Sequence, residues 1–348
     1  MQPAKRKIKI LKAIVEAYIE SGEPVGSKAL CSLLDFPVSS ATVRNEMAEL
    51  SDMGYLTQPY TSAGRVPSEN GYRYYVESLM EKKRLGSNER LFIDDALEES
   101  ADDPEKLLSA AAQIVAKMAN ACVIVTAPSS ESARIHSLKF VRTGRHTCMV
   151  VLISSSGLIK TKLFKCDYVI TQDIVGIYET IFNRSMDGLP VKGITPAFVQ
   201  TIAVEMGELA MLVPNVLGAI MAACSEVCNS GLTVAGRVNL LVDSETDLKS
   251  MRKLTSFLHS DESLEALVCV SRHKEIIIGS EIGFDALSDY SVLSVPYEIE
   301  SGNKGYITAI VPMRSDYAYV ESVAEYTADR VSKLLKNLLQ LGDAEIVD

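Results

Sequence analysis

The sequence predicts a multidomain α+β protein with an N-terminal winged helix-turn-helix, an α/β domain built on an antiparallel sheet, and a mostly helical segment inserted into that domain. Three observations predict this organisation. The chain has 348 residues, more than a single hydrophobic core ordinarily holds. Apolar residues recur at helical spacing near the N-terminus, and strand-like runs with hairpin turns follow. A helical stretch rich in Ala, Met and Leu then separates two groups of strands.

The N-terminal quarter of the chain is expected to form four helices and a β-hairpin. The predicted helices span residues 8–21, 27–34, 39–53 and 68–79, and the extended segments span residues 55–58 and 65–67. Gly22 and Gly54 follow the first and third helices, where a left-handed residue commonly ends a helix. Pro37 cannot continue the second helix, and one of the two serines after it caps the third. Helix, short helix, turn, helix and hairpin is the order of a winged helix-turn-helix.

The rest of the chain is divided by its periodicity into further segments. We expect the winged helix-turn-helix over residues 1–85, a linker over 86–103, the first part of the α/β domain over 104–188, the inserted domain over 189–268, and the second part of the α/β domain over 269–348. Hairpin turns at Thr143-Gly144 and Ser155-Ser156-Gly157 separate strand-like runs of the first part. A final helix from about Tyr317 to Leu341 closes the chain.

Charge is distributed unevenly along the chain. The formal net charge is −10, which disfavours nucleic-acid or membrane binding by the whole surface. Residues 1–90 hold 13 Lys and Arg against 11 Asp and Glu, so the front end carries +2 and the remainder −12. A localised anion-binding site is therefore permitted at the front end. Five of its cations lie in "KRKIKILK": Lys5, Arg6, Lys7, Lys9 and Lys12.

Cysteine usage and the absence of an apolar leader indicate the compartment. Seven scattered cysteines are typical of free, buried thiols in a reducing environment. The charged N-terminus contains no signal-peptide pattern. The longest apolar stretch, residues 209–224, contains Pro214 and Asn215 and is shorter than the roughly 20 residues of a membrane span. We therefore expect a cytoplasmic protein that does not enter a membrane.

The third helix has one apolar side and one polar side. With Val43 as the reference and about 100° per residue, Met47 and Leu50 fall within about 40° of it. Asn45 and Ala48 fall on the opposite side. A helix that enters the major groove of DNA needs such a face, because small residues allow close approach and polar residues read base edges.

Candidate DNA contacts lie on this helix, on the following loop and on the fourth helix. Asn45 can bond adenine with two hydrogen bonds, and Arg44 can bond guanine or a phosphate. Arg65, at the end of the loop "TSAGR", can enter a minor groove or hold a phosphate. The full set of predicted contacts is Ser39, Ser40, Thr42, Arg44, Asn45, Thr61, Ser62, Arg65, Tyr72 and Arg73. Helix-turn-helix units also serve as protein-interaction modules, so a scaffold that never touches DNA stays an alternative.

Several motifs resemble the HrcA family of bacterial heat-inducible transcription repressors. The segments "GEPVGSKAL", "VSSATVRNEMAELSDMGYL" and "TSAGRVPSENGYRYYV" are similar to the family signature from Gly22 to Val76. Further on, "IIIGSE" and "PMRSDYAYVESVAEYTADRVSKLL" resemble a family strand and the family's final helix, so the resemblance covers nearly the whole chain. One departure is "VPMRSDY", residues 311–317, where family members commonly read Gly-Pro-Thr-Arg-Met-Asp-Tyr.

The resemblance implies a winged-helix domain, a GAF-like domain and a dimerisation domain inserted in the latter. It also implies a homodimer that binds an inverted-repeat operator (CIRCE) in double-stranded DNA before chaperone operons, with activity maintained by the GroEL chaperonin. The Met- and Ala-rich stretch over residues 203–224 suits a helical dimer interface or, equally, an internal core. GAF-like domains can hold small ligands, so a metabolite-responsive regulator is the alternative within gene control.

No pattern in the sequence indicates an enzyme, a cofactor or a metal. The sequence lacks G-x-S-x-G, a Walker loop, H-E-x-x-H and a dinucleotide-binding glycine run. Cys224, Cys228, His259, Cys269 and His273 have no tight metal-ligand spacing and are interpreted as structural.

Overall fold

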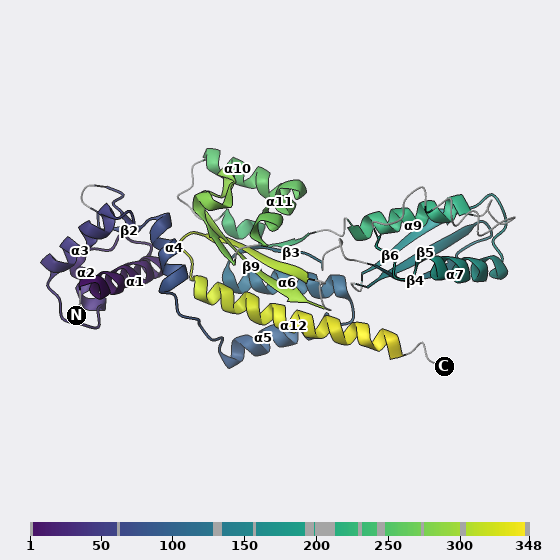
Figure 1. Cartoon of the computed structure of the whole chain (residues 1–348), viewed down its shortest axis with the longest axis horizontal. Helices are drawn as coiled ribbons and strands as arrows, with labels where there is room; N and C mark the ends of the chain where they lie inside the picture. The colour runs from purple at the N-terminus through teal and green to yellow at the C-terminus, as the bar shows by residue number, and fades with distance from the viewer. Residues whose placement is uncertain are drawn as a thin grey trace.

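The computed structural model describes residues 3–60, 63–127, 134–155, 158–191, 198, 213–228, 232–241, 248–272, 275–299 and 304–344. These residues form three units that follow one another along an elongated molecule (Figure 1). We call them the N-terminal unit (residues 3–85), the central unit (residues 86–127 and 232–344) and the distal unit (residues 134–228), in each case for the described residues only. All strand pairings in the described parts are antiparallel. The chain is therefore a mixed helix-and-sheet protein, as predicted.

The N-terminal unit packs three helices against a hairpin and a fourth helix. Its elements are α1 (Pro3–Ser21), α2 (Ser27–Leu33), α3 (Ser40–Asp52), β1 (Leu56–Thr57), β2 (Val66–Pro67) and α4 (Glu69–Ser78). Gly22 and Gly54 adopt φ angles of +73° and +81° at the ends of α1 and α3. Ser39 caps α3 and Ser68 caps α4 through their side-chain oxygens. The element bounds agree within one residue with those expected from periodicity and capping, except that α1 begins at Pro3, five residues earlier than expected.

The central unit is a five-stranded sheet with helices on both faces. Its strands, in the order β7-β3-β10-β9-β8, are β7 (Thr233–Ala235), β3 (Cys122–Val125), β10 (Lys304–Pro312), β9 (Tyr290–Glu298) and β8 (Ile276–Ile278). Its helices are α5 (Ser87–Glu98), α6 (Pro104–Ala119), α10 (Leu248–His259), α11 (Asp261–Ser271) and α12 (Tyr317–Ala344), with short helices η3 (Arg237–Leu240), η4 (Gly279–Ile282) and η5 (Asp285–Leu287). Alternate residues of β3 explain the layers: Val123 and Val125 join the core with α6 and α12, and Cys122 and Ile124 join the core with α10 and α11.

The distal unit is a three-stranded sheet with both of its described helices on one face. Its elements are β4 (Ile135–Arg142), β5 (Thr147–Ser154), β6 (Ile159–Lys165), α7 (Gln172–Met186) and α9 (Val213–Cys228). On β5, Cys148, Val150 and Leu152 are buried in the core shared with α7 and α9. The intervening residues lie on the opposite face, which no described helix covers (Figure 1).

The chain divides at different places from those expected. Strands β4 to β6 were placed with the α/β domain, but they pair only with one another and share a core with α9. The insertion therefore begins before β4 and ends after α9, rather than spanning residues 189–268. Helices α10 and α11, expected in the insertion, pack instead on the central sheet. The physical reason is that alternating apolar and polar residues indicate a strand but do not determine which strand it pairs with.

Burial corrects the expected linker and supports the internal-core alternative for the described part of residues 203–224. The expected linker over residues 86–103 contains α5, because Ile93 and Leu97 lie four residues apart and are fully buried against α6 and α12. Of the stretch over residues 203–224, only α9 is described, and its apolar side faces the core of its own unit. In the described residues, no helix is both long enough and apolar enough to cross a bilayer.

Candidate nucleic-acid interface

Helix α3 presents a small and polar face to solvent. Val43, Met47 and Leu50 are at most 5% exposed and face α1 and α2, as the periodicity predicts. Arg44 and Asn45 are exposed on the other side. Ala41 and Ala48, also exposed, flank them and add little bulk. This face can approach a flat or grooved partner closely while it offers a guanidinium and a carboxamide.

Serine and threonine hydroxyls gather at the start of α3. The Ser39 hydroxyl oxygen accepts from the backbone N–H of Thr42 at 3.1 Å and lies 2.9 Å from the Thr42 hydroxyl. The Ser40 and Ser27 hydroxyls share a hydrogen bond of 3.0 Å, which joins the starts of α2 and α3. A helix start carries unpaired N–H groups and a partial positive charge, so this end of α3 suits a phosphate oxygen. The structure thus brings the three predicted contacts of this segment together.

The loop between β1 and β2 is fastened to the connector before α2. Arg65 and Val25 exchange two backbone hydrogen bonds, each 2.9 Å long, which add a short third rung beside the hairpin. Gly64 permits this approach, because a Cβ there would lie 2.4 Å from the Val25 carbonyl carbon. Arg65 therefore lies at the base of the hairpin, next to the connector before α2. Thr61 and Ser62, the predicted tip contacts, lie outside the described residues.

The basic cluster of α1 mostly neutralises carboxylates of its own unit and of the segment that follows it. Its ion pairs are Arg6–Glu46, Lys7–Glu49, Lys9–Asp35 and Lys12–Glu81. The Lys9 ammonium, hydrogen-bonded to Asp35, lowers the pKa of that carboxyl below its usual value. Four of the five cations are therefore paired within the protein, which weakens the interpretation of this cluster as an anion-binding site. In the described part of the chain, no carboxylate pairs with Arg44, Lys28 or Arg65.

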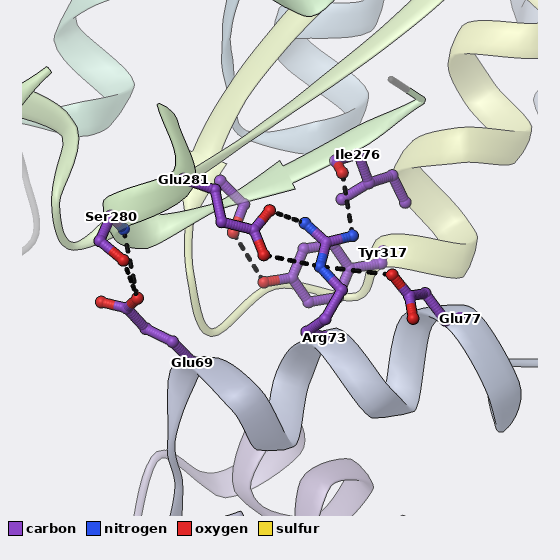
Figure 2. A network of polar contacts seen from close by, with 8 residues as sticks. Glu69, Arg73, Glu77, Ile276, Ser280, Glu281 and Tyr317 are labelled. Carbon is purple, nitrogen blue, oxygen red and sulfur yellow. Dashed lines mark hydrogen bonds and ion pairs between the residues drawn. The ribbon is translucent and has the colours of Figure 1, made fainter. Parts of the chain in front are cut away.

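Tyr72 and Arg73 do not lie near the exposed polar face of α3. Tyr72 is 2% exposed, its ring packs edge-on against Tyr317 at 6.1 Å, and its hydroxyl has no hydrogen-bond partner among the described residues. Arg73 donates to Glu281 and to the carbonyl of Ile276 in the central unit (Figure 2). The spacing of apolar residues predicts that both residues lie on a helix, but it does not predict which unit they contact.

Two residues of the N-terminal unit were missed by the sequence reasoning. Glu46 is a charged residue on α3 that is only 4% exposed. A signal existed, since Glu46 lies three residues after Val43 and thus on the apolar side of the helix. Lys28, exposed near the start of α2, is the second. It follows Ser27, so a basic residue at the start of a helix next to the predicted reading face was visible in the sequence.

The cysteines and histidines considered as metal ligands are separated in the structure. Cys224 is buried in the core of the distal unit, whereas His259 and Cys269 lie on α10 and α11 of the central unit. Nδ1 of His259 shares a hydrogen bond of 2.8 Å with the carbonyl oxygen of Thr255. The Cys228 side chain and His273 lie outside the described part. Within the described residues, no group of three potential metal ligands is found.

A family model and the curated relatives point to one family. A family model described as the HrcA protein C-terminal domain matches residues 105–320. A heat-inducible transcription repressor HrcA of Alkaliphilus metalliredigens is 32% identical over 343 residues, which cover 98% of this chain and 99% of the relative. The protein of the same name from Lachnoclostridium phytofermentans is 31% identical over 345 residues, which cover 97% of this chain and 99% of that relative. The crystal structure of a hypothetical protein has a similar fold, with a TM-score of 0.64, 23% identity, and coverage of 96% of this chain and 98% of that chain.

Proposed function

The chain belongs to the HrcA family of heat-inducible transcription repressors, and we propose that it represses heat-shock (chaperone) operons by binding an inverted-repeat operator as a dimer. In this proposal the N-terminal unit is a winged helix-turn-helix. Helix α3 is its recognition helix, and the loop between β1 and β2 is its wing. The central unit is the GAF-like domain, and the distal unit is the inserted dimerisation domain. The role is binding and regulation rather than catalysis.

The observation that carries the proposal is the unpaired polar face of α3. Arg44 and Asn45 lie exposed between small residues, while the opposite side of the helix is buried. A cation that is not neutralised within the protein can release counterions from DNA when it binds. Arg44 and Asn45 would then read base edges in the major groove, and the hydroxyls of Ser39 and Thr42 would hold a backbone phosphate.

The hairpin supplies a second contact in this proposal. The Arg65 side chain, at the base of the loop, would bind a phosphate or enter the adjoining minor groove. Lys28 would add a phosphate contact from α2, which the two-serine hydrogen bond holds next to α3. A single unit with so few cationic contacts is expected to bind weakly, because each phosphate contact contributes a modest electrostatic gain. Two linked units raise the affinity through effective concentration.

The open face of the distal sheet is the proposed surface for dimerisation. On that face, Val141 of β4, Ile159 and Leu163 of β6 are 45%, 52% and 65% exposed. Strand pairing sets Met149 between Val141 and Leu163. Such a contiguous apolar sheet face favours burial against a second copy, and a two-fold axis there matches the symmetry of a palindrome.

Regulation by a GroEL-type chaperonin is the part of the proposal that rests on the family resemblance. In this scheme, the chaperonin keeps the repressor competent, and repression lapses when unfolded proteins occupy the chaperonin. The alternative is a metabolite-responsive repressor with the central unit as its sensor. A cavity of about 280 Å³ at the edge of the central unit, lined in part by Asn120, Asn239 and Arg314, favours that alternative because it offers polar groups to a small ligand.

A gel-shift titration with an inverted-repeat operator tests the proposal. We expect a complex with the palindrome, at least about a thousandfold tighter than with a shuffled duplex of equal composition at the same stated salt. Purified GroEL should then increase the active fraction of repressor. If the wild-type chain binds both duplexes equally, the repressor function is wrong. If only small metabolites and not GroEL change the binding, the alternative replaces the chaperonin scheme.

A further inference from the structure

Helix α4 of the N-terminal unit lies against the edge of the central sheet. Arg73 Nε donates to Glu281 Oε1 at 2.9 Å, and Arg73 Nη1 donates to the Ile276 carbonyl at 3.1 Å. One turn earlier on α4, Glu69 Oε2 accepts from the Ser280 hydroxyl at 2.6 Å and from the Ser280 N–H at 3.3 Å. Figure 2 shows both contacts side by side. We call the four residues Glu69, Arg73, Ser280 and Glu281 the latch.

The latch fixes the orientation of α4 on the central sheet as well as its distance from the sheet. Residues 69 and 73 are four apart, so they lie on one face of α4 about 6 Å apart along its axis. The two contacts have opposite polarity: α4 supplies a cation at one and a carboxylate at the other. A sliding or flipped helix would therefore bring like charges together. Two such points determine how the axis of α4 lies across the sheet edge.

The backbone on the central side is shaped to receive α4. Gly279 has a φ of +55°, and a Cβ at this position would lie 2.6 Å from the Glu69 carboxyl carbon. An L-residue there would be strained and would also displace Glu69. Strand β8 is an edge strand, and Arg73 satisfies its Ile276 carbonyl, which has no further strand beyond it. The sequence "IIIGSE" thus forms a receptor for α4.

Apolar packing continues the contact behind the polar groups. The ring of Tyr72 packs against that of Tyr317, and the Tyr317 hydroxyl shares a hydrogen bond of 2.8 Å with the buried Ser291 hydroxyl. The buried residues of the N-terminal unit form one contiguous apolar cluster with those on the α6 and α12 side of the central sheet. The two units are therefore joined by a packed interface and not by the connecting segment alone.

The closed latch leaves the proposed DNA-binding face free. In Figure 1, α3 lies at the end of the N-terminal unit away from the central unit, whereas α4 lies next to the central sheet. The latch therefore orients the reading face and does not cover it. An orienting contact affects a two-fold symmetric DNA-binding protein through the separation and angle of its two recognition helices.

We propose that the latch residues are positioning residues that set the half-site spacing accepted by the repressor. This inference rests on the proposed function. With the latch closed, two rigidly held α3 helices match only one spacing, because each added base pair rotates the second half-site by about 34° and shifts it by about 3.4 Å. With the latch broken, each N-terminal unit samples many orientations, so affinity for the matched operator falls and tolerance of altered spacing rises.

Charge reversal with a spacer series tests the inference. The variants are Arg73→Glu, Glu281→Arg and the double variant, and the matched control is Glu77→Gln. Glu77 forms an ion pair with Arg73 at 3.7 Å from the same helix, and it makes no hydrogen bond or ion pair with the described residues of the central unit. Each protein is titrated with the palindrome and with a palindrome that carries two extra base pairs at its centre. Wild type and Glu77→Gln should bind the palindrome with the longer spacer about tenfold or more weakly than the matched palindrome, and we call this loss of affinity the spacer penalty.

The expected result for Arg73→Glu is weaker binding to the matched palindrome and a spacer penalty of less than about threefold. The double variant should regain the wild-type penalty, because it restores the ion pair with reversed polarity. A wild-type spacer penalty in Arg73→Glu would overturn the inference. A wild-type chain that does not prefer the palindrome would instead overturn the proposed function. If the wild-type chain prefers the palindrome and Arg73→Glu keeps the wild-type spacer penalty, only the inference about the latch fails.

Hydrogen exchange of the Ser280 amide reports the latch without DNA. Glu69 accepts from this amide, so peptides covering residues 276–284 should exchange about tenfold faster in Arg73→Glu than in wild type or Glu77→Gln. Unchanged exchange would show that Arg73 does not hold the units together and would contradict the inference. Faster exchange with an unaltered spacer penalty would also contradict it, since the orientation would then have no effect on spacing.

Discussion

Arg6 of α1 and Glu46 of α3 form an ion pair on the inner side of the proposed recognition helix. Arg6 Nε donates to Glu46 Oε1 at 2.9 Å, and the Glu46 side chain is 6% exposed against 28% for that of Arg6. The carboxylate is thus held away from the DNA-binding face, where it would repel phosphates. The pair fastens the first helix to the helix that is proposed to enter the groove.

Removal of Arg6 should destabilise the protein more than removal of its neighbour Lys9. Arg6→Ala leaves the carboxylate of Glu46 buried without its partner, so the free energy of unfolding should fall by about 2–3 kcal/mol. Lys9→Ala is the matched control, because its pair with Asp35 is largely exposed and is worth less than about 1 kcal/mol. Urea denaturation of both variants measures the difference. Equal losses would show that the Arg6–Glu46 pair does not fasten the helix.

Truncation of Arg44 should weaken operator binding and relax its sequence preference. A base-reading arginine contributes about 1–3 kcal/mol at one position of the site. Arg44→Ala should therefore lose that amount on the palindrome and much less on a shuffled duplex. Lys333→Ala, on α12, is the control and should bind like wild type. A similar loss on every duplex would mean that Arg44 contacts only a phosphate.

Arg65 is expected to act through its charge. Each phosphate contact adds about 0.9 to the slope of log affinity against log salt concentration. Arg65→Ala should lower that slope by about one unit per subunit in contact, whereas Lys82→Ala, whose ammonium pairs with Glu325 at 3.0 Å, should not change it. Binding isotherms at four or more salt concentrations give the slope. A slope equal to that of wild type rules out a charge contact at Arg65.

The open face of the distal sheet should tolerate no charge if it is the dimer interface. Leu163, 65% exposed in the isolated chain, lies on that face. A buried lysine without a partner is strongly unfavourable, so Leu163→Lys should weaken the dimer by at least about 2 kcal/mol. Thr180→Lys, an exposed position on α7, serves as control. Sedimentation velocity that finds both variants dimeric at micromolar concentration would place the interface elsewhere.

The thiols should differ in reactivity according to burial. Desolvation raises the pKa of Cys122 and of Cys148 to about 11, so hardly any thiolate forms at pH 8. Cys269 is exposed. Brief alkylation of the folded protein at pH 8 should therefore modify Cys269 first, as peptide mapping will detect, and all three should react in denaturant. Labelling of Cys122 as fast as Cys269 in the folded chain would contradict the buried position of β3.

Local sequence patterns predict the elements of this fold better than their assembly. The ends of α1 and α3 follow from Gly22 and Gly54, whose positive φ angles the structure contains. Strands β4 to β6 follow from alternation and hairpin turns. Their separation from the central sheet does not follow from these patterns. Which strands pair depends on which helices pack on them to form a hydrophobic core. Their pairing with one another and the core that they share with α7 and α9 place them in a unit of their own.

The same limit applies to the candidate site. Rotation by about 100° per residue predicts that Val43 is buried and that Arg44 and Asn45 are exposed, because one helix determines both. Arg73 was predicted to contact DNA, but in the structure it binds Glu281, 208 residues further along the chain. Likewise, the α1 cations were expected to attract DNA, but Arg6 meets a carboxylate 40 residues further on. Charge in a sequence does not show whether the folded chain neutralises it.

Hydroxyl-radical footprinting of the wild-type protein on the inverted-repeat operator tests the central claim most directly. The account predicts two equivalent protected patches related by the two-fold axis of the palindrome and separated by a whole number of helical turns, with Arg44→Ala losing protection in both. Uniform protection, or no symmetrical protection at any salt concentration, would contradict the assignment of α3 as the element that enters the groove.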